Sequence, residues 1–332
     1  MRHGGAGVWV SRPMRPCVPP EILSKPPQIA RKTARMRRRR PHPGSDPPAG
    51  VVSYGTMKLA VLSDIHGNVP ALAAVLDDIE RWGAERLIVN GDLVSRGPYS
   101  LECLRLLQAR APDAHFLTGN HETYVLRCAD EPADPESPTH DIDRFADWAR
   151  RQLGAAVDEI RTWGDQLDLT DLEGGATVLV THGSRLGNRD GISVRTRDDD
   201  LPAKLGEPRD LFIGSHTHRP LLRRFNGTLV VNTGSVGQPM DGDARAAYGR
   251  FTLIGGRWQA EIARVVYDKA QAERDFIDSG FLVEAGPIAR LIYLELRQSR
   301  THLGPWRQRY LEAVKGRELS VTAAVDAYLR AL

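Results

Sequence analysis

The chain has 332 residues, of which 41% are hydrophobic and 26% charged, and this composition is typical of a soluble globular protein. No stretch approaches the roughly 18 consecutive apolar residues of a membrane-spanning helix, so we expect no membrane-spanning segment. The three cysteines, Cys17, Cys103 and Cys128, are widely spaced and match no zinc-binding pattern, which indicates a reducing cytoplasm.

The net charge of +3 divides unevenly along the chain. Residues 1–56 hold 11 Lys or Arg against two acids, a balance of +9, whereas the rest holds 34 bases and 40 acids, a balance of −6. The first segment also contains 10 of the 22 prolines and too few apolar residues for a core, so we expect a disordered basic extension. A misassigned start, with the protein beginning at Met57, is the favoured interpretation. A tail attracted to nucleic acid or membranes and a targeting peptide are the alternatives.

From Lys58 onward, short apolar runs alternate with amphipathic segments. Strands are predicted at 59–63, 86–90 and 114–119, and helices at 70–82, 100–110 and from about His121. Strands that alternate with helices in this order predict a parallel sheet with helices packed on it.

An acidic, proline-rich segment at 129–140 interrupts this alternation. A helix is predicted at 141–153, and a further helical stretch to about Leu167. Later strands are predicted at 177–182 and 210–216, and in hairpins around Asn226-Gly227 and Gly255-Gly256. The chain then becomes helical, and its last helix follows the predicted cap Ser320. We therefore expect one domain at 57–268, and a helical C-terminal extension at 269–332 that packs on it.

Polar side chains with metal-binding chemistry follow five of the predicted strands. They are Asp64 and His66, Asp92, the sequence GNHE at 119–122, His182, and His216 with His218. A lone Asp-x-His or His-x-His is weak evidence, because capping aspartates and packed histidines are common. Five of the ten histidines at strand ends are harder to explain by packing. Buried carboxylates in such a cluster would repel one another unless a cation lies among them, and sites of open α/β sheets lie at these strand ends.

The order of these motifs resembles the calcineurin-like metallophosphoesterase superfamily, whose five blocks read D-x-H, G-D, G-N-H-[DE], H and G-H-x-H. All five occur in order between residues 58 and 267, with Ser215 in the place of the usual Gly of the fifth block. The later run at 229–251 is similar to the small, single-domain bacterial branch. The resemblance implies an α/β fold, a four-layer α/β/β/α sandwich, here with a helical C-terminal extension.

The resemblance also implies two divalent metal ions and the residues that bind them. The first ion would be held by Asp64, His66, Asp92 and His218, and the second by Asp92, Asn120, His182 and His216. Two such ions clamp phosphoryl oxygens and convert a bridging water to hydroxide at neutral pH. The mixed ligands suit Mn²⁺ first, with Fe, Ni²⁺ or Zn²⁺ as alternatives. Asp92 and His121 would be catalytic, with His121 protonating the leaving oxygen, and Asn120 and His121 would also face the substrate phosphate.

The second block, NGDLVSRG at 90–97, is similar to the branch that contains Ser/Thr phosphatases and diadenosine tetraphosphatases. In that branch the arginine of G-D-x-V-D-R-G binds substrate phosphate, which makes Arg96 a candidate substrate-binding residue. Ser95 replaces the Asp that precedes this arginine in the branch. A surface arginine before a turn at Gly97-Pro98 is the alternative.

The expected function is a dinuclear-metal phosphoesterase that hydrolyses small phosphodiesters or phosphomonoesters by attack of the metal-bridged hydroxide. A protein-phosphatase-like enzyme, a dinucleoside polyphosphate hydrolase and a non-catalytic binding module are the alternatives. We expect a small phosphate ester as the partner and a cytoplasmic location. The acidic body argues against nucleic acid as a partner of the core domain. We expect no membrane partner, and the sequence leaves open whether the protein forms a homo-oligomer.

Overall fold

The computed structural model of the protein describes residues 56–131, 133–170 and 172–332. The basic extension expected at 1–56 lies outside these residues, apart from Thr56. Among the helices of the described residues, none is long and apolar enough to cross a membrane.

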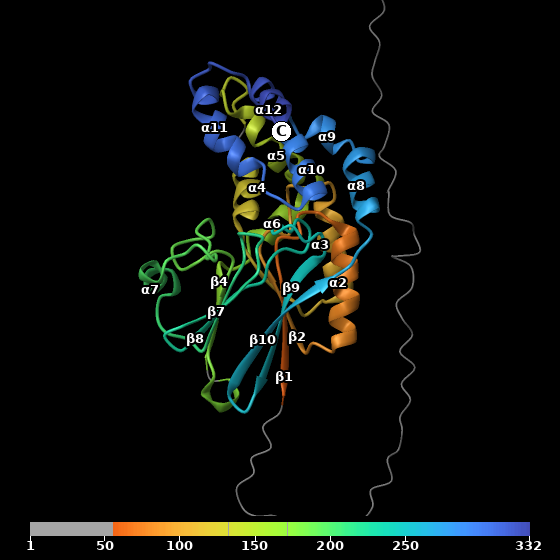
Figure 1. Ribbon diagram of the computed structural model, residues 1–332. Helices are drawn as coiled ribbons and strands as arrows, with labels where there is room; N and C mark the ends of the chain where they lie inside the picture. The colour runs from red at the N-terminus through yellow and green to blue at the C-terminus, as the bar shows by residue number, and fades with distance from the viewer. Residues whose placement is uncertain (1–55, 132, 171) are drawn as a thin grey trace, which may run out of the picture. The chain divides into compact units, whose positions relative to one another are not determined.

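In the part of the chain that the structure describes, ten strands form two five-stranded sheets that lie face to face (Figure 1). The first sheet has the order β10 (Arg257–Val265), β9 (Ala246–Ile254), β1 (Met57–Leu62), β2 (Arg86–Asn90) and β3 (His115–Leu117). The second has the order β4 (Gln166–Leu169), β5 (Val178–Thr181), β6 (Leu211–Gly214), β8 (Thr228–Asn232) and β7 (Leu221–Phe225). Strands β1, β2 and β3 are parallel to one another, as are β5, β6 and β8. Because parallel strands end at the same edge, each sheet brings its carboxyl-terminal loops together.

The sheets pack through side chains that alternate along each strand. In β1, Leu59 and Val61 face the second sheet, whereas Ala60 and Leu62 face helices. The layer between the sheets also receives apolar side chains from β2, β3, β5, β6, β8, β9 and β10. This two-sided burial explains why β1 is an almost continuous apolar run.

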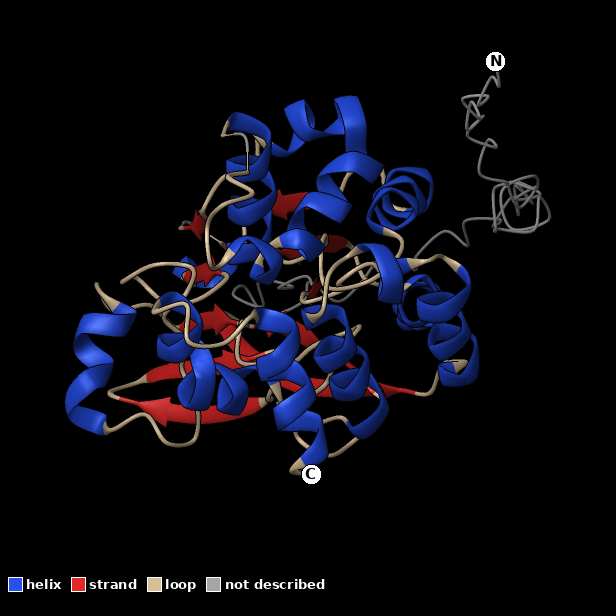
Figure 2. Ribbon diagram, turned by 90° about the horizontal axis from the view of Figure 1, so that it is seen from above, coloured by secondary structure: helices blue, strands red, loops and turns tan. Residues whose placement is uncertain are grey.

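Helices cover the outer faces of both sheets and give the expected four layers. The main helices on the first sheet are α2 (Val69–Trp82) and α3 (Ser100–Arg110). The second sheet is covered by a thinner layer, the short helix α7 (Leu201–Leu205) and the residues around it, including η4 (Asp198–Asp200). Figure 2 shows these strands between helices when the molecule is seen from above.

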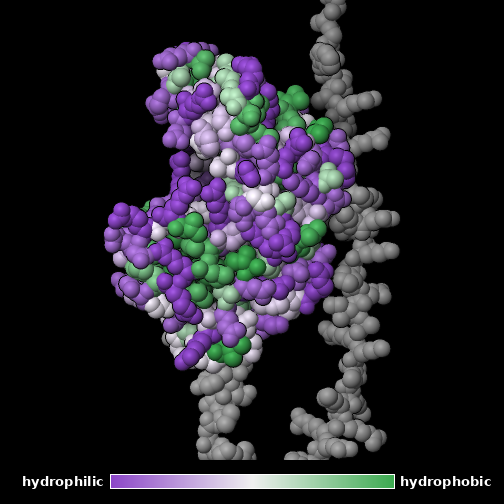
Figure 3. Space-filling view, in the orientation of Figure 1, coloured by the Kyte–Doolittle hydropathy of each residue, from purple (hydrophilic) through white to green (hydrophobic). Residues whose placement is uncertain are grey.

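A second hydrophobic core lies among the C-terminal helices and the helices that follow β3. The C-terminal helices are α8 (Lys269–Asp278), α9 (Phe281–Glu284), α10 (Ile288–Gln298), α11 (Leu303–Lys315) and α12 (Val321–Arg330). Their partners in this core are α4 (Asn120–Asp130), η1 (His140–Ile142) and α5 (Arg144–Leu153). Hydrophilic residues dominate the face of the C-terminal helices seen in Figure 3, because their apolar faces are turned into this core. In Figure 1 the C-terminal helices lie above the edge at which β1 ends.

The structure confirms most of the predicted elements and corrects one. Both hairpins form, and their turn residues Asn226, Gly227, Gly255 and Gly256 have positive φ angles, as tight two-residue turns require. Ser320 caps α12 by accepting a hydrogen bond from the backbone N–H of Ala323. The predicted helical stretch to Leu167 is wrong.

Helix α5 is instead followed by η2 (Gly154–Ala156) and α6 (Val157–Ile160), and then by the edge strand β4. A short 3₁₀ turn, η3 (Glu173–Gly175), precedes β5. Strand β4 pairs antiparallel with β5, and its exposed and half-buried residues alternate with period two. The helical prediction failed because four residues with this pattern do not distinguish an edge strand from a helix end.

Candidate active site

The polar side chains at the strand ends converge on one place, although they come from two different sheets. Asp64 and His66 follow β1, and Asp92 follows β2, in the first sheet. His182 follows β5, and His216 and His218 follow β6, in the second sheet. Their ligand atoms form two groups, within each of which all atoms lie within 4.8 Å of one another. The groups are Asp64, His66, Asp92 and His218, and Asp92, His182 and His216.

Asp92 is the residue that the two groups share. Its Oδ2 lies 3.8 Å from Nε2 of His66 and 3.3 Å from Nε2 of His182. In the first group, Nε2 of His218 lies 3.1 Å from Oδ1 of Asp64 and 3.2 Å from Nε2 of His66. These side chains are almost fully buried, so the carboxylates face imidazoles rather than water.

Backbone carbonyls orient the imidazoles. Nδ1 of His218 donates to the carbonyl of Gln238 at 2.7 Å, and Nδ1 of His182 donates to the carbonyl of Asn90 at 2.8 Å. Nδ1 of His66 lies 3.4 Å from the carbonyl of Val94. With Nδ1 as the donor, the lone pair of each Nε2 points into the cluster, which is the arrangement of metal-binding histidines.

The buried atoms without partners show that the cluster fits divalent cations. Oδ1 of Asp64, Oδ1 of Asn120 and Nε2 of His182 have no hydrogen-bond partner among the described residues. A buried acceptor without a donor costs free energy, whereas a cation in each of the two groups would satisfy these atoms. Oxygen and imidazole nitrogen donors of this kind suit Mn²⁺, Fe, Ni²⁺ and Zn²⁺.

The electrostatics of the cluster also favour a positive charge at its centre. Burial lowers the pKa of His182, but the neighbouring carboxylate of Asp92 outweighs burial and raises the pKa to about 10. Burial, with the charge of His182 beside it, lowers the pKa of His216 to about 4. The carboxylates of Asp92 and Asp64 thus stabilise a positive charge among them, which a divalent cation would supply.

Five of these residues hold an unusual backbone conformation. Asp64, His66, Asp92, His216 and His218 have φ angles between 51° and 65°, in the left-handed region that L-residues seldom adopt. Each such residue costs on the order of 1–3 kcal/mol and persists only where its surroundings enforce it. The N–H groups of residues 64 to 67 donate to carbonyls of residues 91 to 93, which ties the two strand-end loops together. The strained backbone thus directs these side chains toward one point.

Glycines allow the loops to approach one another this closely. A Cβ on Gly91 would lie 2.6 Å from the backbone nitrogen of Gly119 and 2.7 Å from Nδ1 of His182. A Cβ on Gly119 would lie 2.2 Å from Oδ1 of Asp92. The glycines of the G-D and G-N-H blocks are therefore required by contact with the cluster itself.

Glu122 supports the same loops, a role that its motif position did not reveal. Its buried carboxylate accepts hydrogen bonds from the backbone N–H groups of Asp92, Leu93, Val94 and Gly119, at 2.7 to 3.2 Å. Burial and the nearby charge of Asp92 raise the pKa of Glu122 to about 7. Four N–H donors act in the opposite direction because they stabilise the ionised carboxylate. Glu122 thus joins the second and third blocks.

Asn120 and His121 begin α4 and face a cavity beside the cluster. The backbone N–H of His121 donates to Oδ1 of Asp92 at 2.8 Å, and its Nδ1 has no partner among the described residues. The ring of His121 lies 4.9 Å from the ring of His66. Burial lowers the pKa of His121 to about 3, and the charge of a bound phosphate would act in the opposite direction.

Arg96 is buried at the wall of this cavity, so the interpretation as a surface arginine is wrong. Its guanidinium pairs with the carboxylate of Glu295 in α10, and its Nε donates to Oε1 of Gln238 at 2.9 Å. The structure therefore places Arg96 beside the cluster, but with two partners that the sequence did not predict.

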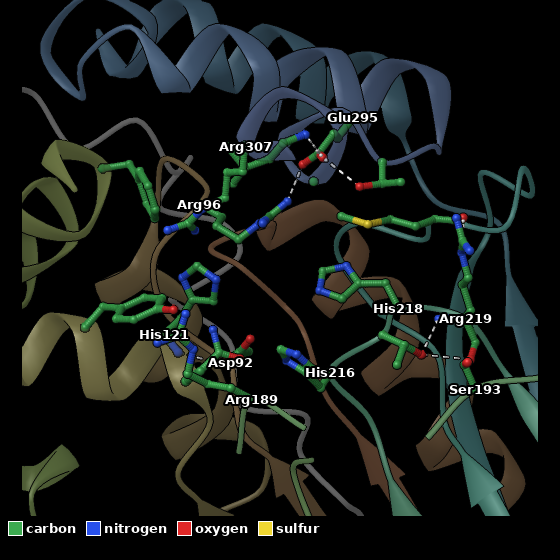
Figure 4. A pocket seen from close by; sticks show the side chains of 18 of the residues that line it. Asp92, Arg96, His121, Arg189, Ser193, His216, His218, Arg219, Glu295 and Arg307 are labelled. Atoms are coloured by element: carbon green, nitrogen blue, oxygen red, sulfur yellow. Dashed lines mark hydrogen bonds and ion pairs between the residues drawn. The ribbon is translucent and has the colours of Figure 1, made fainter. Parts of the chain in front are cut away.

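The cavity has a volume of about 530 Å³, the size of small-molecule sites. Besides the cluster, it is lined by Tyr124, Phe145 and several arginines (Figure 4). Arg189, Arg195, Arg219 and Arg307 form no ion pair with a carboxylate of the described residues. Sequence reasoning missed these arginines, because they lie in loops and in α11, outside every motif.

Comparisons with known proteins agree with this geometry. A family model, that of the calcineurin-like phosphoesterases, matches residues 57–242. A symmetrical bis(5'-nucleosyl)-tetraphosphatase of Enterobacter sp. (strain 638) is 32% identical over 112 residues, which cover 31% of this chain and 40% of that protein. The chain thus spans less than half the length of this relative. The uncharacterized protein MJ0912 of Methanocaldococcus jannaschii is 29% identical over 231 residues, 64% of this chain and 89% of that protein.

Solved structures also resemble this one. A metallophosphoesterase from Sphaerobacter thermophilus superposes with a TM-score of 0.58 and 26% identity, over 73% of this chain and 99% of that chain. The hypothetical protein PH1004 from Pyrococcus horikoshii OT3 has the same fold, with a TM-score of 0.58 at 19% identity over 70% of this chain and 97% of that chain. The expected fold class is therefore confirmed. Because the family model matches more than half of its residues, the chain belongs to the calcineurin-like phosphoesterase family.

Proposed function

We propose that the protein is a metal-dependent phosphoesterase that hydrolyses small phosphodiesters or phosphomonoesters at this cluster. The observation that carries the proposal is that Asp92 is shared by two groups of ligand atoms, beside buried atoms of Asp64 and His182 that have no hydrogen-bond partner among the described residues. The first ion would be held by Asp64, His66, Asp92 and His218, and the second by Asp92, Asn120, His182 and His216. We favour Mn²⁺ among the ions that suit these donors.

Two such ions, when bound, polarise the phosphoryl oxygens and lower the pKa of a coordinated water. The side chains of the protein perform the remaining tasks. Asn120 orients the substrate phosphate from the start of α4, and His121 faces the leaving oxygen, to which its imidazole donates a proton. The cluster side chains are themselves buried, so polar contacts made to them are stronger than in bulk water.

A second candidate function is the hydrolysis of dinucleoside polyphosphates. The similarity to symmetrical bis(5'-nucleosyl)-tetraphosphatases supports it, as do the arginines around the cavity that lack carboxylate partners. Such a substrate carries several phosphates, each of which a guanidinium can bind in a bidentate manner. Tyr124 and Phe145 in the same wall offer aromatic surface for a base.

A cytoplasmic location is part of the proposal. Cys103 and Cys128 are free thiols, which supports a reducing compartment.

A screen of metals against substrates tests the function. The full chain, stripped of metal, is reconstituted with Mn²⁺, Ni²⁺, Zn²⁺ or Mg²⁺ and offered a monoester, a diester, a cyclic nucleotide and a dinucleoside polyphosphate. We expect metal-dependent release of product from at least one ester, and no release by an Asp92→Asn variant. Turnover only of the dinucleoside polyphosphate would establish the second candidate, and no turnover with any metal would refute both.

A further inference from the structure

Glu295 is a buried carboxylate that α10 places against Arg96, 199 residues earlier in the chain. Its side chain is 1% exposed, and that of Arg96 is 8% exposed. Oε1 of Glu295 also accepts hydrogen bonds from the backbone N–H groups of His302 and Leu303, at 2.6 and 2.7 Å. A buried charge needs such partners, because removing one leaves the other uncompensated.

The contacts of Arg96 continue from Glu295 to the metal-binding cluster. Its Nε donates to Oε1 of Gln238, and the side-chain amide of Gln238 donates back to the carbonyl of Arg96 at 3.1 Å. The backbone carbonyl of Gln238 in turn accepts the 2.7 Å hydrogen bond from Nδ1 of His218. A continuous set of buried polar contacts therefore links α10 to a proposed metal ligand.

The backbone of Arg96 explains why it needs these contacts. Ser95 and Arg96 have φ angles of 67° and 57°, two consecutive left-handed residues without a glycine. Such a conformation is costly and has to be enforced by its neighbours. The two-point contact with Gln238 and the ion pair with Glu295 provide this enforcement.

Glu295 also sets the position of α11 relative to the cavity. The N–H groups that donate hydrogen bonds to Glu295 belong to the residues at which α11 begins. N–H groups at the start of a helix have no partner within the helix. The same helix contributes Arg307 to the cavity wall, which also includes Glu295 and Arg96 (Figure 4). Helices α10 and α11 lie beyond residue 242, where the family model ends.

We propose that Glu295 is a positioning residue for the phosphate-binding side of the active site. It holds the guanidinium of Arg96 at the cavity wall and fixes the start of the helix that carries Arg307. A guanidinium has five N–H groups, and the contacts to Glu295 and Gln238 leave others for a phosphate. The C-terminal helices thus contribute to the phosphate-binding side of the cavity. This inference rests on the proposed phosphoesterase function.

Glu295→Gln tests the proposal, because it removes the charge while it keeps the shape of the side chain. Inorganic phosphate is titrated calorimetrically into the full, metal-loaded chain, and kcat and KM are measured for a monoester. We expect phosphate binding and kcat/KM to fall about 10- to 100-fold, the value of one charged hydrogen bond. The metal content should be unchanged. Phosphate that binds as tightly as to the wild type, or more tightly because Glu295 competes for Arg96, would overturn the proposal.

Two controls separate positioning from a general structural role. Asp326→Asn removes the ion pair between Arg290 of α10 and Asp326 of α12, 2.5 Å long and on the surface, and should leave phosphate binding unchanged. In an Arg96→Ala background, Glu295→Gln should cause a smaller loss, because only the contact of Glu295 with the start of α11 then remains to be removed. An equal loss in both backgrounds would mean that Glu295 acts without Arg96, and would refute the proposal.

A further variant covers the case in which Glu295→Gln does not fold. Glu295→Asp keeps the charge but shortens the side chain. This variant should fold, and its affinity for phosphate should lie between those of the wild type and Arg96→Ala. Binding at the wild-type level would count against the proposal. If the wild type turns over no ester with any metal, the proposed function fails, whereas the phosphate titrations still decide the role of Glu295.

Discussion

Oδ2 of Asp92 lies 3.3 Å from Nε2 of His182, and this contact crosses from the first sheet to the second. Asp92 follows β2 and His182 follows β5, so neither sheet alone contains both residues. The candidate site therefore exists only when the apolar layer between the sheets is packed.

Asp92→Asn should remove most of the bound metal, because it takes the shared negative charge from both groups of ligands. Elemental analysis after dialysis measures the loss directly. Asp78→Asn is the matched control, since Asp78 accepts a 2.6 Å hydrogen bond from Arg250 and does not line the cavity. Full metal content in Asp92→Asn would disprove the assignment of a shared ligand.

Asn120→Ala and His121→Ala should fail in different ways although the residues are neighbours. Asn120→Ala should weaken metal binding, whereas His121→Ala should keep the metal and lose the proton donor. General-acid catalysis contributes about 10²–10⁴ in rate, so His121→Ala should be slow on esters of poor leaving groups. Nitrophenyl esters need little protonation and should suffer less. Equal losses on both kinds of ester, or loss of metal from His121→Ala, would contradict the role of His121 as the acid.

Glu122→Gln should destabilise the fold and weaken metal binding together. The carboxylate of Glu122 accepts hydrogen bonds from backbone N–H groups, and the amide of Gln would turn its own N–H toward some of them. We expect this to lower the free energy of unfolding by about 2–4 kcal/mol. Urea denaturation measures the free energy of unfolding, and a metal titration measures affinity. Glu131→Gln, at the exposed end of the same helix, should change neither. A Glu122→Gln variant as stable as the wild type would show that these loops do not depend on the carboxylate.

Arg307→Ala should discriminate between the two candidate functions. On a dinucleoside polyphosphate, we expect kcat/KM to fall about 10- to 100-fold, because a bidentate contact to a second phosphate is lost. On nitrophenyl phosphate, whose single phosphate lies at the metal centre, the change should be much smaller. Arg309→Ala changes an exposed arginine of the same helix and should alter neither substrate. Equal effects of Arg307→Ala on both substrates would remove the support for a polyphosphate substrate.

The sequence alone was sufficient to predict that the candidate metal ligands follow strand ends. Each of them lies one to four residues beyond a strand, and the alternation of strands and helices predicts that the first strands are parallel. Asp64 and Asp92 were therefore placed at the ends of consecutive predicted strands, which pair in the first sheet. Strand β4 was missed, because a four-residue edge strand has too short a pattern.

The tertiary structure alone decided the rest of the cavity. Periodicity and spacing are local properties, whereas the contact between Arg96 and Glu295 joins residues 199 positions apart. In its amphipathic helix, Glu295 is one more charged residue until the packing of α10 buries it. Arg307 follows no motif and reaches the cavity only because α11 lies above the strand ends. The residues at the strand ends could be predicted because the apolar pattern of a strand shows where the strand ends. The way helices pack over that edge depends on contacts between side chains that are distant in the sequence.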